Sequence, residues 1–302
     1  MSRFYYFRQD GRCPVMKNVL EKSVPRYLID RNETQQTSYY FILDWNVLHH
    51  SDVYRDFLKS SGIRFVETID DLPEGAGIFA GGYGGDPVAL DKARAKGIPM
   101  IDKICPWVKF LEQDIRSVPE GYQCVILIDE FHIVYKNFKS LFPENTLIVN
   151  EKNYREKCEG LDRDKPVFLC VYATFRQKDF DNVKHCIEKK LPGLPHKSSS
   201  RGICSWITRN SLFDEIGQVI PGRGLSQVWI ICNSEYNRSV LTLINEIEDK
   251  GAEARLLKHV DDIPLELPES GNIGVLIAPV PFDKDREILN AIKERFEGIP
   301  VL

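Results

Sequence analysis

The stretch "DKICPWVK", residues 102–109, places a cysteine at the start of a predicted helix, directly after the apolar run "GIPMI". Pro106 suits the first helical position, because a proline there removes an N–H group that has no partner within the helix. Two further stretches share the pattern, "GRCPVMKNVL" at 11–20 and "GICSWITRNSL" at 202–212. In each, the cysteine is followed by a helix-starting residue, an apolar pair, and Lys or Thr. Our prediction of the fold rests on this threefold repetition.

The cysteines of the pattern are Cys13, Cys105 and Cys204, and they are nearly evenly spaced. An interval this long indicates repetition of whole units rather than a solenoid. Between the cysteines, apolar runs such as "QCVILIDE" and "PVFLCVYA" alternate with amphipathic segments such as 106–116 and 178–190. Alternation of this kind predicts an α/β fold with mostly parallel sheets, whose strands are buried on both faces.

We therefore predict three α/β units related by a pseudo-threefold repetition and meeting where their cysteines converge. The units are residues 14–104, 105–200, and 201–302 together with 1–13. The short strand in "RFYYF" near the start should pair with the third unit. The segment 189–202, "KKLPGLPHKSSSRG", is expected to be a linker because it is rich in Pro, Gly and Ser.

Composition excludes several classes of protein. The chain has 302 residues, 43% of them hydrophobic, and a formal net charge of −4. A charge of this sign gives no electrostatic attraction to nucleic acid. No stretch has the length of a transmembrane helix or the apolar core of a signal peptide. We expect a cytoplasmic protein that binds neither nucleic acid nor membrane.

The chain has eight cysteines, and in a cytoplasmic protein these are more often thiols or metal ligands than disulfides. Cys124, Cys170 and Cys232 lie in apolar runs, where cysteine acts as a small buried hydrophobe. Cys158 and Cys186 lie in polar helical stretches, and we expect no role for them. The three repeated cysteines remain.

A cysteine at a helix N-terminus has a lowered pKa and suits a thiolate or an anionic cluster. Three thiolates can bind zinc, or can hold an iron–sulfur cluster with one iron open to a substrate. The sequence has no C-x-x-C, which excludes an ordinary zinc knuckle or a ferredoxin-type run. Spacing alone leaves a cluster, zinc and coincidence open.

Polar loops follow the predicted strands, at the edge where parallel α/β sheets bind ligands. Together they describe a lined pocket, and no G-x-G-x-x-G or P-loop supports a nucleotide cofactor. The loops are "NVLHH" with His49 and His50, "GGYGG" at 81–85, His132 after "VILIDEF", the run from Thr174 to Arg176, "NSEYNRS" at 233–239 and "APVPF" at 278–282.

The cysteine contexts "GRCPVM", "DKICPWV" and "RGICSWITRN" resemble, in order and at similar spacing, those of the 4-hydroxy-3-methylbut-2-enyl diphosphate reductase (LytB) family. The resemblance covers the whole chain. It implies a tripartite α/β fold around a central [4Fe-4S] cluster. The cluster would be held by Cys13, Cys105 and Cys204, with one iron open. It also implies an electron donor of the ferredoxin or flavodoxin type.

The substrate pocket of the family carries over only in part. "LHH" places the family's first pocket histidine at His49, and "HIV" keeps a histidine at His132. Val134, however, stands where the family has its catalytic glutamate. Gly82 replaces the second pocket histidine, and Ala173 stands where a pocket threonine belongs, directly before a retained Thr174.

The loop "SEYNR" keeps Asn237 but has Glu235 and Tyr236 in place of two serines that bind diphosphate in the family. A negative charge at Glu235 opposes a bound diphosphate through like-charge repulsion. No serine is found in "APVPF" either. The resemblance thus implies a divergent relative with a remade substrate pocket.

We predict an iron–sulfur oxidoreductase that acts on a different small, anionic substrate bound at the open iron. Two alternatives stay open: the diphosphate reductase itself, and a non-enzymatic cluster-bearing sensor or electron-transfer protein. Arg176 and Arg238 either clamp the anion or are plain surface arginines. The predicted catalytic residues are His132, His49, Glu235 and Tyr236, and the predicted substrate-binding residues are these four with Thr174, Arg176, Asn237 and Arg238.

Overall fold

The computed structural model describes residues 2–7, 64–204, 212–232, 238–278 and 284–301, and the backbone alone of 40–43 and 211. The chain folds into two compact units. The one-sheet unit comprises Met1–Pro14, His49–Val53 and Arg209–Leu302, and the two-sheet unit comprises Val15–Leu48 and Tyr54–Thr208.

The two-sheet unit contains two four-stranded sheets of order β3-β2-β4-β5 and β7-β6-β8-β9. Every described strand pair is parallel, which confirms the predicted sheet type. The strands are β2 (Tyr40–Leu43), β3 (Arg64–Val66), β4 (Gly77–Ala80), β5 (Met100–Asp102), β6 (Gln123–Leu127), β7 (Leu147–Val149), β8 (Val167–Val171) and β9 (His196–Ser199).

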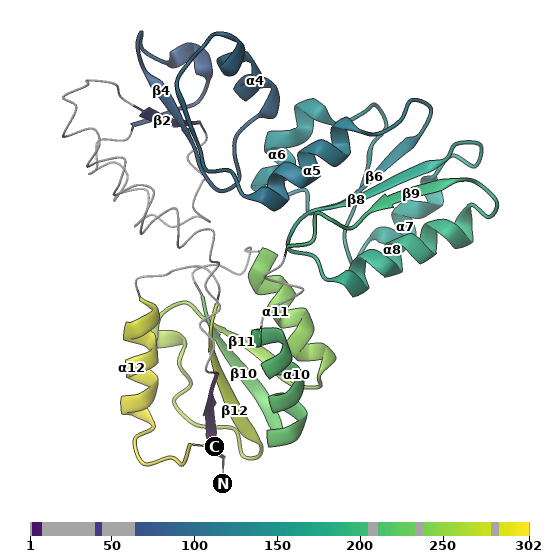
Figure 1. Cartoon of the computed structure of the whole chain (residues 1–302). Coiled ribbons are helices and arrows are strands. Elements are labelled where there is room, and N and C mark those ends of the chain that lie inside the picture. Colours follow the sequence, from purple (N-terminus) through teal and green to yellow (C-terminus); the bar gives the residue numbers. More distant parts are fainter. Residues whose placement is uncertain are drawn as a thin grey trace. The chain divides into compact units, whose positions relative to one another are not determined.

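Helices follow most of these strands, as α/β units require (Figure 1). Apart from the half-buried Gln123, which begins β6, the central strands β6 and β8 are apolar and buried, so helices must cover both faces of their sheet. The helices are η2 (Ile69–Asp71), α4 (Pro87–Ala95), α5 (Pro106–Arg116), α6 (Ile133–Phe138), η3 (Lys139–Leu141), α7 (Tyr154–Lys157), η4 (Cys158–Gly160) and α8 (Gln177–Lys190).

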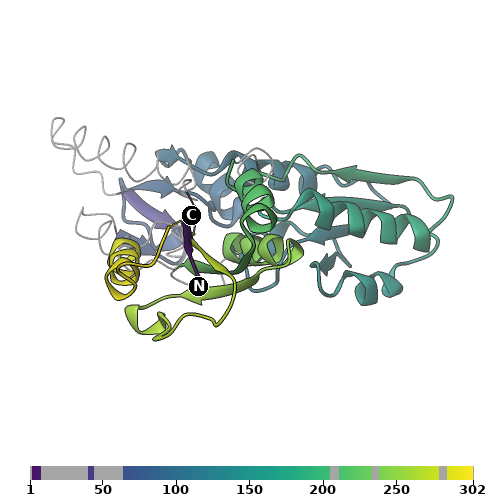
Figure 2. The same cartoon turned by 90° about the horizontal axis from the view of Figure 1, so that it is seen from below.

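The one-sheet unit has a parallel sheet of order β1-β12-β10-β11. The N- and C-termini lie side by side in both views (Figures 1 and 2), and the N–H of Phe4 donates to the carbonyl of Pro300 at 3.1 Å. Its elements are β1 (Phe4–Tyr6), α10 (Ser211–Arg223), β10 (Leu225–Ile231), α11 (Arg238–Asp249), β11 (Glu253–Leu257), η5 (Val260–Asp262), β12 (Asn272–Ile277) and α12 (Asp285–Arg295).

The three sheets share one strand order, provided that β1 counts as the fourth strand after β10, β11 and β12. From one edge of each sheet to the other, the strands then lie in the order second, first, third and fourth, where the numbers give their order along the chain and β1 counts as fourth. A cysteine of the repeated pattern follows each fourth strand, at Cys105 after β5, Cys204 after β9 and Cys13 after β1. The pairing of β1 with β12 confirms that the N-terminal strand belongs to the third sheet. The unit boundaries 14–104, 105–200, and 201–302 together with 1–13 stay predictions.

The predicted linker at 189–202 is wrong in part, because it contains the edge strand β9. This strand, "HKSS", has no apolar residue, and its side chains are exposed or half-buried. It is a strand because its backbone pairs with the buried β8 in four successive positions, from Val167–His196 to Cys170–Ser199. Hydrophobic patterning cannot reveal an edge strand that buries so little.

Helix α5 connects the two sheets of its unit. It follows β5, the edge strand of one sheet, and it packs on β8 of the other sheet. Val108, Leu111 and Ile115 form its buried face. The buried Asp114 on the same helix accepts from Nε of Arg201 at 2.6 Å, and Arg201 lies three residues before Cys204. The helix that starts at Cys105 is therefore tied directly to the segment that leads to Cys204.

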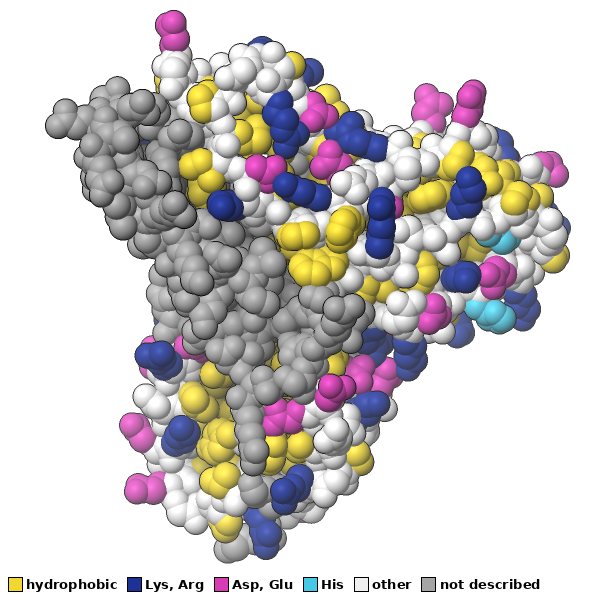
Figure 3. Space-filling model, in the orientation of Figure 1, with side chains coloured by type: hydrophobic (Ala, Val, Ile, Leu, Met, Phe, Trp, Pro, Cys, Tyr) yellow, Lys and Arg dark blue, Asp and Glu magenta, His cyan; other side chains and the backbone are white. Residues whose placement is uncertain are grey.

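Over α4 and α5, Lys/Arg and Asp/Glu side chains are intermixed on the face seen in Figure 3. Arg116 pairs with Asp91 at 2.6 Å, and Lys109 pairs with Asp102 at 2.8 Å. Exposed pairs of this kind contribute about 0–1 kcal/mol each. In the described part of the chain, no helix is both long enough and apolar enough to span a bilayer.

Candidate functional site

Cys105 lies at the N-cap of α5, where its backbone is held on both sides. Its N–H donates to the carbonyl of Gly82 at 2.8 Å, and its own carbonyl accepts from the N–H groups of Val108 and Lys109 at 3.0 and 3.1 Å. The side chain is half-buried and is not in a disulfide. Because α5 is an 11-residue helix, its positive end favours a thiolate or another anion at this position.

Cys204 is held by the corresponding bond in the next repeat. Its N–H donates to the carbonyl of Ala173 at 2.8 Å, and its buried side chain is not in a disulfide. Gly202, two residues earlier, passes close to the end of β8. A Cβ at Gly202 would lie 2.2 Å from the carbonyl oxygen of Val171, so only glycine fits there.

Gly82 and Ala173 therefore occupy equivalent places, each at the second residue beyond a central strand, β4 or β8. Each offers a backbone carbonyl to a cysteine of the repeat. These are two positions where the resemblance expects polar pocket side chains. The bonds that position the cysteines need only the main chain, so these bonds persist whatever side chain stands there.

His132 is the N-cap of α6, and its ring is clamped between two tyrosines. Nδ1 accepts from the N–H of Val134 at 3.1 Å. The ring centroid lies 4.4 Å from that of Tyr172 and 5.2 Å from that of Tyr83. Since Nδ1 accepts, the neutral ring carries its proton on Nε2, which makes Nε2 a hydrogen-bond donor. The clamp brings together the loops that follow β4, β6 and β8.

Sequence reasoning missed both tyrosines of this clamp. Tyr83 is the central residue of "GGYGG", and Tyr172 directly follows β8. A single aromatic residue in a glycine-rich loop is the signal that could have pointed to Tyr83. Its partner His132 lies 49 positions further along the chain, so the contact becomes visible only when the strands are placed in order.

A substitution pair separates the capping role of His132 from its ring. We expect His132→Ala to unfold at lower denaturant than His132→Asn, with a difference of about 1 kcal/mol, because asparagine restores the acceptor for the N–H of Val134. Urea unfolding of the two variants measures this difference. Equal midpoints would mean that the bond from Val134 contributes nothing to the start of α6.

Val134 has 0% of its surface exposed. It stands at the position that the resemblance gives to a catalytic glutamate, so an apolar side chain is buried where a carboxyl group was expected. Position 134 therefore supplies no proton. The imidazole of His132 lies two residues earlier in the sequence.

The two predicted anion-binding arginines are both buried, so the interpretation as plain surface arginines is wrong. Arg176 has 9% of its surface exposed and Arg238 has 1%. Arg176 binds Asp179 through two bonds, Nε to Oδ2 at 3.1 Å and Nη2 to Oδ1 at 2.9 Å. Its guanidinium is thus engaged by the Asp179 carboxylate, which also accepts from the backbone N–H of Arg176 at 3.1 Å at the start of α8. Thr174 lies half-buried between Ala173 and the buried Phe175.

Several predicted site residues lie outside the described residues, and their assignments stay predictions. They are Cys13, His49, Glu235, Tyr236 and Asn237. Within the described ranges, no three His, Cys, Asp or Glu side chains form a group that could hold a metal ion. The described part accordingly supplies two thiols of the three that a cluster would need.

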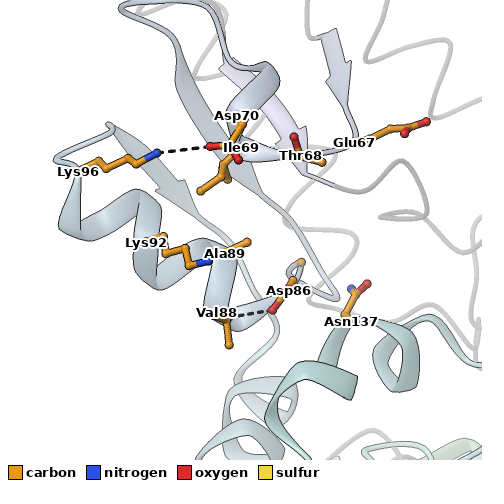
Figure 4. A pocket seen from close by; sticks show the side chains of 11 residues that line it. Glu67, Thr68, Ile69, Asp70, Asp86, Val88, Ala89, Lys92, Lys96 and Asn137 are labelled. Atoms are coloured by element: carbon orange, nitrogen blue, oxygen red, sulfur yellow. Dashed lines mark hydrogen bonds and ion pairs between the residues drawn. The ribbon is translucent and has the colours of Figure 1, made fainter.

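A cavity of about 580 Å³ lies elsewhere in the two-sheet unit, between the loop after β3 and helix α4 (Figure 4). Its charged groups are the ammonium groups of Lys92 and Lys96 and the carboxylates of Glu67, Asp70 and Asp86. Lys96 is already 3.5 Å from Asp70. Three carboxylates against two ammonium groups do not favour a diphosphate, so we do not assign the substrate to this cavity.

Fold and site together define a class: an α/β protein of parallel four-stranded sheets, in which a repeated cysteine follows the edge strand β1, β5 or β9 in the sequence. A model of the LytB protein family matches residues 27–275. The chain belongs to the LytB family.

Relatives and solved structures agree with this assignment. The 4-hydroxy-3-methylbut-2-enyl diphosphate reductase of Chlamydia trachomatis serovar A is 23% identical over 259 residues, which is 84% of this chain and 81% of the relative. That of Tropheryma whipplei is 24% identical over 239 residues, or 78% and 74%. The E-1-hydroxy-2-methyl-but-2-enyl-4-diphosphate reductase structure from Plasmodium falciparum superposes with a TM-score of 0.78 at 17% identity, covering 100% of this chain and 92% of that one. This superposition confirms the fold.

Proposed function

We propose that the protein is a cytoplasmic iron–sulfur reductase whose small anionic substrate differs from the diphosphate in the names of its relatives. The observation that carries the proposal is the fully buried Val134 beside His132, where the resemblance expects a catalytic glutamate. The cysteines of the family pattern are kept while this pocket position has changed chemistry. Retained thiols with a changed pocket favour a shared cofactor and a different substrate.

The donor set fits an iron–sulfur cluster. Cys105 and Cys204 are held by equivalent backbone bonds, and the first lies at a helix N-terminus that favours negative charge. With Cys13 they would hold a [4Fe-4S] cluster with one open iron, which supplies the substrate with electrons. A ferredoxin or flavodoxin would be the electron donor.

The chain's own side chains would bind and orient the substrate. Nε2–H of His132 is a donor on a ring fixed by Tyr83 and Tyr172, so it can hold a hydrogen bond or deliver a proton without reorganising. We assign Glu235 and Tyr236 as further proton sources. Substrate contacts are assigned to His49, Thr174, Asn237 and Arg238, with Arg176 and its bound Asp179 holding the start of α8 beside Thr174.

A viologen-coupled assay tests the proposal. Protein reconstituted anaerobically, with its cluster verified by visible absorption and by iron and sulfide content, is offered 4-hydroxy-3-methylbut-2-enyl diphosphate. We expect dye oxidation at the background rate, because Val134 supplies no carboxyl group and Glu235 repels a diphosphate. A screen of other small anions with the same cluster-loaded protein would then identify the substrate.

The second candidate is the diphosphate reductase itself, and the names of the relatives favour it. Dye oxidation well above background with the diphosphate would overturn our proposal and support this candidate. Growth rescue of a host deficient in that enzyme would support it independently. A protein that takes up no cluster would contradict both candidates.

A further inference from the structure

Two cysteines outside the site, Cys158 and Cys186, face each other across a helix contact. Cys158 opens η4, and both α7 and η4 pack against α8, which carries Cys186. Lys190 lies one turn beyond Cys186 on the same face of α8, and it forms an ion pair with Glu159, the residue after Cys158. This register places the two cysteines opposite each other, 28 positions apart in the sequence.

The two thiols interact directly but differ in access to solvent. The Cys158 thiol is hydrogen-bonded to that of Cys186. Cys158 has 1% of its surface exposed, whereas Cys186 is half-buried. Arg155, which is exposed, also lies close enough to Cys186 to interact with it electrostatically. A more accessible thiol backed by a buried thiol is the arrangement of an attacking and a resolving cysteine.

We propose that Cys158 and Cys186 form a reversible dithiol–disulfide site that exchanges with low-molecular-weight disulfides such as oxidised glutathione. The Cys186 thiolate attacks one sulfur of the glutathione disulfide, whose S–S bond breaks, and one glutathione leaves. Cys158 then attacks the Cys186 sulfur of the mixed disulfide and expels the second glutathione. The two cysteines lose two electrons and two protons, which convert one glutathione disulfide into two thiols.

The second step is the slower one. Burial, followed by the charge and the hydrogen bond of Cys186, raises the pKa of Cys158 to about 12; Glu159 raises it further and Lys190 lowers it. Once Cys186 is in the mixed disulfide its negative charge is gone, but burial still keeps Cys158 protonated. A glutathione adduct at Cys186 should therefore form first, before the internal disulfide.

The experiment incubates the full-length protein anaerobically with oxidised glutathione, blocks remaining thiols with N-ethylmaleimide, and maps them by peptide mass spectrometry. We expect a transient glutathione adduct at Cys186, then a cross-link between the peptides of Cys158 and Cys186 that dithiothreitol reverses. Cys158→Ala should stop the reaction at the adduct, and Cys186→Ser should abolish both products.

Cys124 and Cys170 provide a matched control within the same unit. Their thiols also interact, across the adjacent strands β6 and β8, but both residues have 0% of their surface exposed. They should show neither adduct nor cross-link. The proposal is overturned if Cys186 stays fully alkylated after incubation, if its adduct never yields the cross-link, or if Cys124 and Cys170 react as fast. None of these outcomes depends on the substrate or on the cluster assignment.

Discussion

We expect Cys105→Ser to abolish the proposed iron–sulfur cluster and to leave the fold intact. Iron and sulfide content should fall from about four of each per chain to near zero, because two cysteines cannot retain a cluster that needs three. The fold survives because the Cys105 side chain does not cap α5. Serine, a favoured N-cap residue, keeps the backbone bonds to Gly82 and Val108.

The measurement combines iron and sulfide analysis with circular dichroism and urea unfolding of the cluster-free protein. Cys186→Ser is the matched control, because this thiol lies in the same unit on α8 and should leave the iron content unchanged. If Cys105→Ser binds as much iron and sulfide as the parent protein, the assignment of the cluster to the repeated cysteines is wrong. If serine unfolds the protein, Cys105→Ala repeats the test without a new hydroxyl group.

The second large effect is expected from Gly202→Ala. The added Cβ would lie 2.2 Å from the carbonyl oxygen of Val171, so the backbone must move away from the end of β8. Overpacking of this kind costs about 1–3 kcal/mol of unfolding free energy. Because Cys204 follows two residues later, the bond between its N–H and the carbonyl of Ala173 should be lost, and cluster content should fall as well.

Gly160→Ala is the control, because a Cβ there would have no heavy atom within 4 Å. It should change the unfolding free energy by no more than about 0.5 kcal/mol, as other surface substitutions do. Urea midpoints and iron content are measured for both variants. A Gly202→Ala protein with the parent's midpoint and full iron content would show that the segment before Cys204 can shift freely.

The buried pair of Arg176 and Asp179 shows what a sequence pattern leaves out about a predicted site residue. The sequence marked Arg176 as a charged group at a strand end, which is where it lies. It could not show that Asp179, three residues later, accepts two bonds from the guanidinium and a third, at 3.1 Å, from the N–H of Arg176. Local spacing allows such a pair, but burial of both partners is what holds it in place.

Local patterns in the sequence were enough to establish the α/β class, the parallel sheets, the family and the start of a helix directly after Cys105. The patterns are apolar strand runs, proline after cysteine, and the order of segments along the chain. The pairing of β1 with the third sheet was likewise predicted from the sequence and is confirmed by its register with β12, whereas the strand β9 before Cys204 was missed.

Contacts between distant segments, in contrast, came only from the assembled fold. The strand β9 exists through backbone bonds to β8, the ring of His132 is held by Tyr83 and Tyr172, and Cys158 meets Cys186 across two helices. None of these contacts can be read from hydrophobic periodicity in the sequence. Strand β9 is polar, and the other contacts each join single residues that are far apart in the sequence. The energy of these contacts comes from hydrogen bonds and packing between elements that are distant in sequence, so the contacts appear only once the sheets are assembled.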